Sequence, residues 1–210
     1  MEIVLFDKLD STQQYLLKRV KEEQISNIAV VTKKQSQGVG SRGNSWIAKE
    51  GDLLFSFVVK KEDITADLPI SSASIYFGYL FKELLKRYNK DVYLKWPNDI
   101  YLGDKKCGGV ITNLVRDRYV VGIGLNLVER DDGFGYIKEL KEPKSLLESY
   151  FLLLRERPKW KEILTKFRLE FKNSLGFKTH IRGRVVELRD AILCEDGSII
   201  INNERVYSLR

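Results

Sequence analysis

Histidine and cysteine, which supply many nucleophiles, general bases and zinc ligands, are nearly missing from this sequence of 210 residues. His180 is the single histidine, and the two cysteines, Cys107 and Cys194, lie far apart in the chain. The sequence therefore offers no Ser/His/Asp or Cys/His nucleophile set, no zinc-ligand spacing and no disulfide framework. So little cysteine is typical of a reducing compartment, and we expect a cytoplasmic protein.

Long apolar runs are absent as well. No stretch of about 18 apolar residues is present to form a transmembrane helix. The N-terminus, Met1 to Lys8, lacks the basic start and apolar core of a signal peptide. With 43% apolar residues and a mean hydropathy of -0.27, the composition is that of a globular protein. Its length allows one full domain and a small appendage, and we expect no contact with a membrane.

The charge is not balanced: 36 lysines and arginines face 29 acidic residues, which gives a net charge of +7. Such a surface attracts an anionic partner, which could be a nucleic acid, an acidic protein or a nucleotide. The lysines are scattered and often stand beside glutamates, as in Lys18 to Glu23. Because no recognition helix, zinc finger or RNA-binding motif is present, the sequence disfavours a nucleic acid and leaves the other two open.

Hydrophobic periodicity predicts a chain of alternating strands and helices. Strands are predicted at residues 1–9, 28–32, 53–59, 92–96, 99–103, 107–115 and 119–128. Helices are predicted at about 12–23, 72–88, 144–154 and 159–174, with long loops at 33–51 and 129–142. The run Leu53 to Val59 is apolar almost throughout, so it is predicted to be a central strand buried on both faces.

The character of the chain changes at Gly176. From Phe177 to Arg210 the pattern predicts short strands, with a turn at Glu195 to Gly197, and is typical of a small β-barrel cap. About 34 residues are too few for a core of their own, so this segment is expected to pack on the main domain.

A glycine-rich loop, residues 35–46, carries Gly38, Gly40 and Gly43 around Arg42. Glycines at this density let backbone N–H groups approach an anion, and Arg42 could pair with a phosphate. A merely mobile surface loop fits the same pattern. The loop lacks the Gly-Lys-Ser/Thr ending of a P-loop and no helix start follows it, which disfavours that class of nucleotide site.

Two further stretches combine residues that packing alone does not require. Lys95 to Asp99 and Lys105 to Gly109 bring together lysines, an acid, an amide and two glycines, a mixture typical of phosphate chemistry. Ser11 and Thr12 are expected to cap a helix, although their hydroxyls could also bind a polar head group. Asn98 and Asp99, following a proline, could equally form an Asx turn.

Taken in order, these motifs resemble those of the biotin protein ligases. The resemblance covers residues 1–128 and is weaker in the C-terminal cap. The motifs that carry it are Asp10-Ser11-Thr12-Gln13, the glycine-rich loop ending in Trp46, Lys95-Trp96-Pro97-Asn98-Asp99, Lys106 with Gly108-Gly109, and Gly122-Ile123-Gly124-Leu125-Asn126. The Lys95 to Asp99 stretch, with a lysine eleven residues after Lys95, is the most specific of them.

The resemblance implies an enzyme that activates biotin with MgATP to biotinyl-5′-AMP and transfers the biotin to a lysine of a biotin carboxyl carrier protein, commonly part of acetyl-CoA carboxylase. It implies an α+β fold in which a mixed β-sheet is flanked by helices, as in class II aminoacyl-tRNA synthetases. A catalytic domain would span residues 1–175 and a small SH3-like β-barrel domain residues 176–210. Because the Ser11-Thr12 motif lies so near the start, we expect the ligase-only type that binds no DNA, as a monomer or weak homodimer.

The resemblance also implies roles for single residues. Lys106 and Arg42 would be catalytic. Biotin would be bound by Ser11, Thr12, Gln35, Gly38, Gly40, Trp46, Lys106, Gly109 and Gly124. ATP and the adenylate would be bound by Arg42, Asn98, Asp99, Lys106 and Asn126. Asp99 would in addition be a ligand of Mg²⁺.

Two departures from the family pattern stand out. The family loop usually reads Gly-Arg-Gly-Arg-x-Gly-Arg-x-Trp, and its arginine positions here hold Val39, Ser41 and Asn44. The threonine of the first motif is commonly followed by asparagine and is followed here by Gln13. Alternatives are therefore a non-catalytic biotin-binding module and a lipoate-type ligase of the same fold, although lipoate ligases lack the Lys95 to Asp99 stretch.

Overall fold

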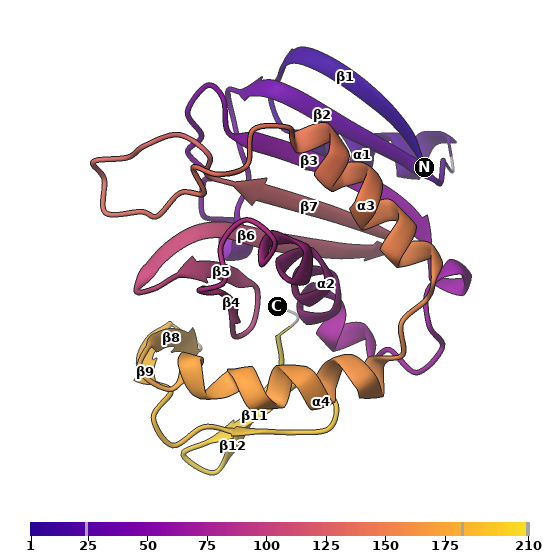
Figure 1. Cartoon of the computed structure of the whole chain (residues 1–210). Helices are drawn as coiled ribbons and strands as arrows, with labels where there is room; N and C mark the ends of the chain where they lie inside the picture. Colours follow the sequence, from indigo (N-terminus) through magenta and orange to yellow (C-terminus); the bar gives the residue numbers. More distant parts are fainter. Residues whose placement is uncertain (24, 182, 209–210) are drawn as a thin grey trace.

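A seven-stranded mixed sheet forms the centre of the molecule in the computed structural model, which describes residues 1–23, 25–181 and 183–208 (Figure 1). The spatial order of its strands is β1-β2-β3-β7-β6-β5-β4. Their bounds are β1 Glu2–Leu9, β2 Ile28–Gln35, β3 Leu53–Lys60, β4 Val92–Lys95, β5 Asp99–Leu102, β6 Lys105–Val115 and β7 Arg118–Leu125. β1 and β2 are parallel and the other neighbours are antiparallel, so the predicted mixed sheet is confirmed.

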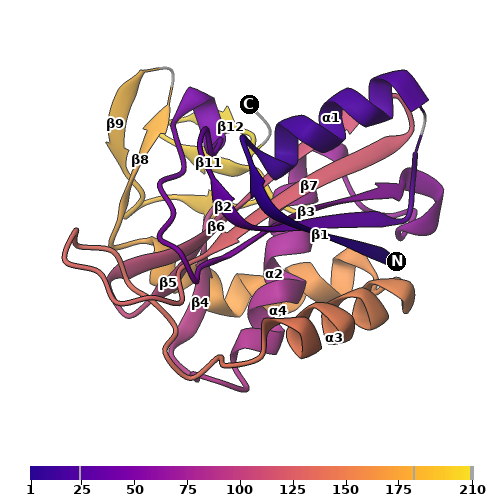
Figure 2. The ribbon, with the colours of Figure 1, turned by 90° about the horizontal axis from the view of Figure 1, so that it is seen from above.

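Helices cover both faces of this sheet. The four α-helices are α1 Thr12–Glu23, α2 Ala73–Leu85, α3 Pro143–Arg155 and α4 Trp160–Glu170. Seen from above, α1 lies on one side of the strands, and α2, α3 and α4 lie on the other (Figure 2). Each helix was predicted from its apolar spacing, and the predicted core residues of α4, such as Trp160 and Phe167, are buried.

The face toward α2 and α3 holds the larger part of the core. Phe55 and Phe57 of β3 form edge-to-face ring contacts with Tyr150 of α3. Phe77 and Phe81 of α2 extend this aromatic cluster. Buried aromatic pairs of this kind stabilise a fold beyond the area that they remove from water. Every residue of β3 except Lys60 is buried, as expected of a central strand.

The face toward α1 has a different character, which the register of three strands explains. A small apolar cluster, including Leu16 and Val20 of α1, covers one end of this face. Beyond that cluster the strands carry a serine and three glycines instead of apolar side chains. Ser56 of β3 pairs with Gly122 of β7. Gly124 of β7 pairs with Gly109 of β6. Glycines within a strand leave space for a ligand or another chain to come close. The sheet is therefore hollowed next to the first turn of α1.

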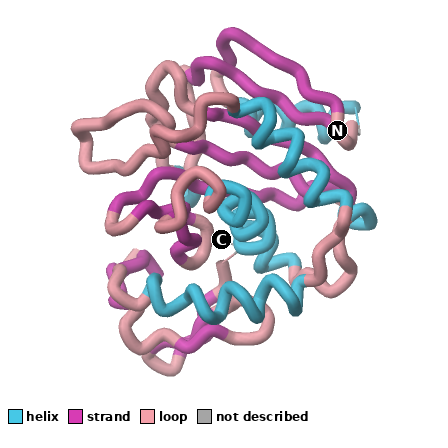
Figure 3. Tube along the Cα trace, viewed as in Figure 1, coloured by secondary structure: helices cyan, strands magenta, loops and turns pink. Residues whose placement is uncertain are grey.

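Long connections gather at one end of the sheet. The loop before β3 and the loop after β7 lie side by side there (Figure 3). The hairpin between β5 and β6 turns at Gly103 and Asp104, as predicted, and Gly103 has φ +60°, which suits a glycine. The hydrogen bonds from Leu127 and Val128 to Asp52 bring the first residues after β7 close to the start of β3.

The C-terminal segment forms short strands that share the core of the main sheet. β8 (Lys178–Ile181) pairs with β9 (Arg184–Glu187), and a separate three-stranded sheet joins β10 (Ile192–Leu193), β11 (Ile199–Ile201) and β12 (Glu204–Val206). These strands fit a small SH3-like unit. The predicted barrel, however, is not closed among the described residues, because strands of two to four residues are too short to pair all the way round.

A turn of this segment anchors it to the main sheet. Trp96 Nε1 donates to Gly197 O at 2.9 Å, and Trp160 Nε1 donates to Glu195 O at 3.0 Å. Both indoles are buried, so these bonds satisfy donors that would otherwise lack a partner.

No helix of the described chain is long and apolar enough to cross a membrane.

Candidate ligand-binding site

A cavity of about 40 Å³ opens in the hollow between the sheet and the start of α1. It collects most of the residues that the sequence motifs had singled out. Those that line it are Ser11, Thr12, Gln35, Gly40, Trp46, Asn98, Lys106, Gly109 and Gly124. Residues from five separate segments thus meet in one place.

A chain of hydrogen bonds forms the polar end of the cavity. The backbone N–H and the hydroxyl of Thr12 both donate to Gln35 Oε1, at 2.7 and 3.1 Å. The hydroxyls of Thr12 and Ser56 lie 2.8 Å apart. Ser11 caps α1 by accepting from Gln14 N at 3.3 Å, and its side chain also lines the cavity. The capping role and the binding role predicted for Ser11 are therefore compatible.

Glycines form the floor of the cavity and Trp46 covers it. A Cβ atom added to Gly124 would lie 2.5 to 2.8 Å from the indole ring of Trp46, and one on Gly109 would lie 3.3 Å from it. The indole therefore rests directly on backbone that carries no side chain. Since it occupies this floor, a ligand larger than a few waters must displace Trp46 to enter.

Lys106 forms the charged end of the cavity, and Asp99, which does not line the cavity itself, pairs with it. Lys106 Nζ lies 2.6 Å from Asp99 Oδ1 and 5.7 Å from the centre of a Trp46 ring. Lys95 Nζ lies 3.7 Å from Asp99 Oδ2. The neighbouring Asn98 is buried, and its Nδ2 donates to Val110 O at 2.8 Å, which fixes the backbone beside Asp99. Lys105, by contrast, is exposed.

The same surroundings fit a resident metal ion poorly. Asp99 is the carboxylate that pairs with Lys106, and lysine ammonium groups face both of its oxygens. Among the described residues, no group of three or more histidines, cysteines, aspartates or glutamates gathers anywhere. A single carboxylate suits a magnesium ion that arrives with a nucleotide rather than one that the protein holds alone.

Cys107 follows Lys106 but points into the opposite, apolar side of the sheet. Burial raises the pKa of its thiol to about 12. Because the thiolate is the reactive form, Cys107 is no nucleophile at neutral pH. This agrees with the sequence, which offered no cysteine-based catalytic set.

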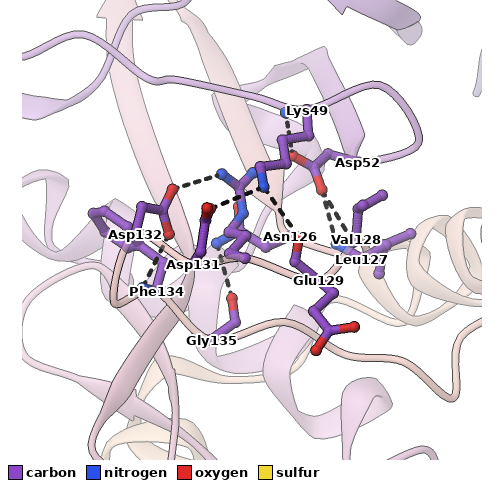
Figure 4. Close-up of polar contacts among 11 residues, drawn as sticks. Lys49, Asp52, Asn126, Leu127, Val128, Glu129, Asp131, Asp132, Phe134 and Gly135 are labelled. Carbon is purple, nitrogen blue, oxygen red and sulfur yellow. Dashed lines mark hydrogen bonds and ion pairs between the residues drawn. The ribbon is translucent and has the colours of Figure 1, made fainter.

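Asn126, predicted to contact the nucleotide, does not line the cavity but fixes the loop that follows β7. Its Nδ2 donates to Gly135 O at 2.9 Å (Figure 4). Its backbone N–H donates to Cys107 O at 2.7 Å. Asn126 therefore closes the base of the 126–135 loop beside Lys106.

A buried carboxylate ties this loop to the loop that follows Trp46. Asp52 Oδ1 accepts from Leu127 N at 3.0 Å and from Val128 N at 3.3 Å (Figure 4). Its other oxygen accepts from Lys49 N at 2.7 Å and pairs with the buried side chain of Arg130. One carboxylate thus joins the two loops that flank the cavity.

The glycine-rich loop folds back on itself. Trp46 N donates to Gly38 O at 2.8 Å and Gly40 N donates to Asn44 O at 2.7 Å, around a 3-10 turn at Ser41–Gly43. Gly38 lies beside the cavity through this bond, without lining it. The side chain of Arg42, predicted to pair with a phosphate, lies outside the described part of the structure.

Among the lining residues that were not predicted to be part of the site, Gln13, Ser56 and Gly122 lie next to one another. Ser56 interrupts one apolar strand, and Gly122, like Gly124, interrupts another, so each carried a signal in the sequence. Gln13 was noted as a departure from a motif and was given no role. All three become visible only when the strand register sets them side by side.

Comparison with known proteins identifies relatives of this chain. The family model "Biotin/lipoate A/B protein ligase family" matches residues 5–127. The "Bifunctional ligase/repressor BirA" of Escherichia coli is 33% identical over 135 residues, which are 61% of this chain and 41% of that protein. "Biotin--protein ligase 2" of Arabidopsis thaliana is 29% identical over 178 residues, 79% of this chain and 50% of that protein. The chain thus spans half, or less, of the length of these curated relatives.

Solved structures match over nearly the whole chain. The crystal structure of "Biotin Acetyl Coenzyme A Carboxylase Synthetase from Helicobacter pylori with bound Biotinylated ATP" is 39% identical, with a TM-score of 0.94 over 98% of this chain and 99% of that one. The "Biotin protein ligase from Aquifex aeolicus in complex with biotin and ATP" has a TM-score of 0.76 at 24% identity, over 100% and 96% of the two chains, and supports the fold alone. The match extends through the C-terminal strands.

Proposed function

The chain belongs to the biotin/lipoate A/B protein ligase family, and on this premise we propose that it is a biotin protein ligase. It activates biotin with ATP to biotinyl-5′-AMP and then transfers the biotinyl group to a lysine of a carrier protein. The observation that carries the proposal is the cavity itself, in which a polar end around Thr12 and Gln35 faces a cation, Lys106, across a floor of glycines.

In the first half-reaction an oxygen of the biotin carboxylate attacks the α-phosphorus of ATP. The bond from that phosphorus to the bridging oxygen breaks, and pyrophosphate leaves. Two anions must approach each other, and the ammonium group of Lys106 offsets their repulsion as negative charge develops. Asp99 holds that ammonium at the edge of the cavity, 2.6 Å from Nζ. Magnesium enters with the substrate as MgATP, and Asp99 positions Lys106 rather than acting as the main metal ligand.

In the second half-reaction the neutral amine of the target lysine attacks the acyl carbon of the adenylate. The bond from that carbon to the phosphate oxygen breaks, AMP leaves, and the new amide nitrogen loses a proton. Trp46 and the glycine-rich loop cover the cavity and would keep water away from the mixed anhydride. The net charge of +7 suits an acidic carrier domain, because attraction between opposite charges speeds encounter.

Further parts of the proposal follow from the family. The carrier is a biotin carboxyl carrier protein such as that of acetyl-CoA carboxylase, and the reaction takes place in the cytoplasm. Residues 1–175 form the catalytic domain and residues 176–210 the SH3-like one. Biotin contacts Ser11, Thr12, Gln35 and Trp46, and the nucleotide lies toward Asn98 and Asn126.

Replacing Lys106 tests the proposal. We expect Lys106→Ala to lower biotin-dependent exchange of pyrophosphate into ATP by about a hundredfold or more, since a charge that stabilises the transition state is lost. Lys105→Ala is the matched control, because it removes the same charge from an exposed neighbour. Exchange that stays near normal in Lys106→Ala would contradict the assignment. Biotin binding without any exchange by the unmodified chain would instead indicate a non-catalytic binding module.

A further inference from the structure

Gln13 lies directly beneath the cavity, in the first turn of α1, and it has only 3% of its surface exposed. Its amide nitrogen, Nε2, donates to Val120 O and to Asn113 Oδ1, each at 3.0 Å. A backbone carbonyl can only accept a hydrogen bond, so Val120 fixes which end of the amide is the nitrogen. The oxygen, Oε1, therefore points the other way.

The Oε1 atom of Gln13 points over Gly122, toward the hollow in the sheet. A Cβ atom at Gly122 would lie 2.7 Å from this oxygen and 3.1 Å from Ser56 Oγ. Gln13 Oε1 is buried and has no hydrogen-bond partner among the described residues. Buried polar atoms nearly always have a partner, so an acceptor that lacks one indicates a group that binds there.

The nearest hydroxyls have no proton to spare for this oxygen. Thr12 donates its single hydroxyl proton to Gln35 Oε1. The hydrogen bond between Thr12 and Ser56 must therefore use the proton of Ser56. With both protons committed, neither of these hydroxyls supplies the hydrogen bond that Gln13 Oε1 lacks.

Donors are present elsewhere in the same cavity. The indole N–H of Trp46 is buried and unpartnered among the described residues. Ser11 accepts from Gln14 N, which leaves its own proton available. The cavity thus presents one hydrogen-bond acceptor and two donors that are available to a ligand. A cyclic urea, whose carbonyl stands between two N–H groups, complements that set, whereas a dithiolane ring has no N–H to donate.

We propose that Gln13 Oε1 accepts a hydrogen bond from a ureido N–H of biotin and thereby makes the site prefer a cyclic urea over a dithiolane. This inference rests on the proposed function and adds to it a residue that determines specificity. A site built to bond a substrate N–H rejects an analogue without it, because the protein group is then left buried and unpaired. Gly122 provides the room, since any side chain there would meet Gln13.

A thermodynamic cycle between protein and ligand tests the contact. The full chain and Gln13→Met are titrated calorimetrically with biotin, with lipoate and with the two cyclic carbamates in which one or the other ureido N–H is replaced by oxygen. We expect Gln13→Met to weaken biotin about tenfold. One of the two carbamates lacks the N–H that bonds Gln13, so it should bind the unmodified chain about tenfold less tightly than biotin. Its affinity should fall little further in Gln13→Met, because that hydrogen bond is already missing. Gln14→Met, the same change at the next, exposed residue, should leave biotin binding unchanged.

Three results would overturn the inference. Gln13→Met could lower the affinities for biotin and for both carbamates equally, or it could bind biotin normally. The unmodified chain could also bind lipoate as tightly as biotin. Should Gln13→Met fail to fold, the unmodified chain still decides, because both carbamates binding as tightly as biotin would exclude the contact. If the unmodified chain binds no biotin at all, the proposed function fails, which is a different outcome.

Discussion

At the scale of single residues, the missing side chain of Gly124 shapes the site. A Cβ there would lie 2.5 to 2.8 Å from Trp46, so alanine fills part of the space that the indole now occupies and that a ligand takes when it displaces the indole. We expect Gly124→Ala to weaken biotin binding about tenfold or more, as judged by calorimetry. Gly176→Ala is the matched control, since no heavy atom lies within 4 Å of a Cβ at that position. Equal affinities of the two variants would show that the floor needs no glycine.

Residues of this site differ in how far the sequence alone could identify them. Thr12, Gln35 and Lys106 stand in motifs, and each was predicted and lines the cavity. Gln13 and Ser56 could not be assigned in this way, because their importance depends on facing Gly122 across two strands and a helix. A register of that kind arises from pairing between distant segments, which local patterns do not encode.

At the scale of elements, α4 depends on a cap supplied from far away in the sequence. Asp67 accepts from Trp160 N at 3.0 Å and from Lys161 N at 3.2 Å, the first backbone donors of that helix. Partial burial opposes ionisation, but the hydrogen bonds from Thr65, Trp160 and Lys161 outweigh it and lower the pKa of Asp67. Such a carboxyl stabilises the fold above its ordinary pKa, and this contribution is lost as the pH falls through the lower, folded-state pKa.

The cap gives a testable pH dependence. We expect Asp67→Ala to reduce the free energy of unfolding by about 1 kcal/mol at neutral pH. The deficit should shrink as the pH falls from the ordinary aspartate value of 3.8 through the lower, folded-state pKa, where the folded unmodified chain loses the same charge. Thermal unfolding followed by circular dichroism at neutral and acid pH measures both quantities. Asp190→Ala, at an exposed site, is the control, and a deficit independent of pH would contradict the role of the charge.

Element boundaries were predicted well where local signals exist. The hairpin turn at Gly103 and the start of α1 after Ser11 both follow residue preferences that act over a few positions. The helix predicted over 72–88 ends at Leu85, and the strand predicted over 28–32 continues to Gln35. Pairing with β1 explains the second difference, because Lys34 and Gln35 are held by Lys8 and Leu9 rather than by their own propensity.

At the scale of the whole molecule, one hydrophobic core runs from the main sheet into the C-terminal strands. Leu188, Ile199 and Val206 belong to the same buried cluster as Phe55. The sequence indicated this arrangement, since a segment so short cannot form a core alone. It did not reveal that the strands stay in two separate sheets, because closure depends on strand lengths that turn signals do not fix.

Mass spectrometry of a carrier domain tests most directly whether this cavity and Lys106 make the chain a biotin protein ligase. A biotin carboxyl carrier domain is incubated with the full chain, biotin and MgATP, and its intact mass is then measured. We expect the addition of one biotinyl group to one lysine, with no addition when ATP is omitted or when Lys106→Ala replaces the unmodified chain. A carrier that remains unmodified in the complete mixture would show that the chain is not a ligase for this carrier and would contradict the proposed function.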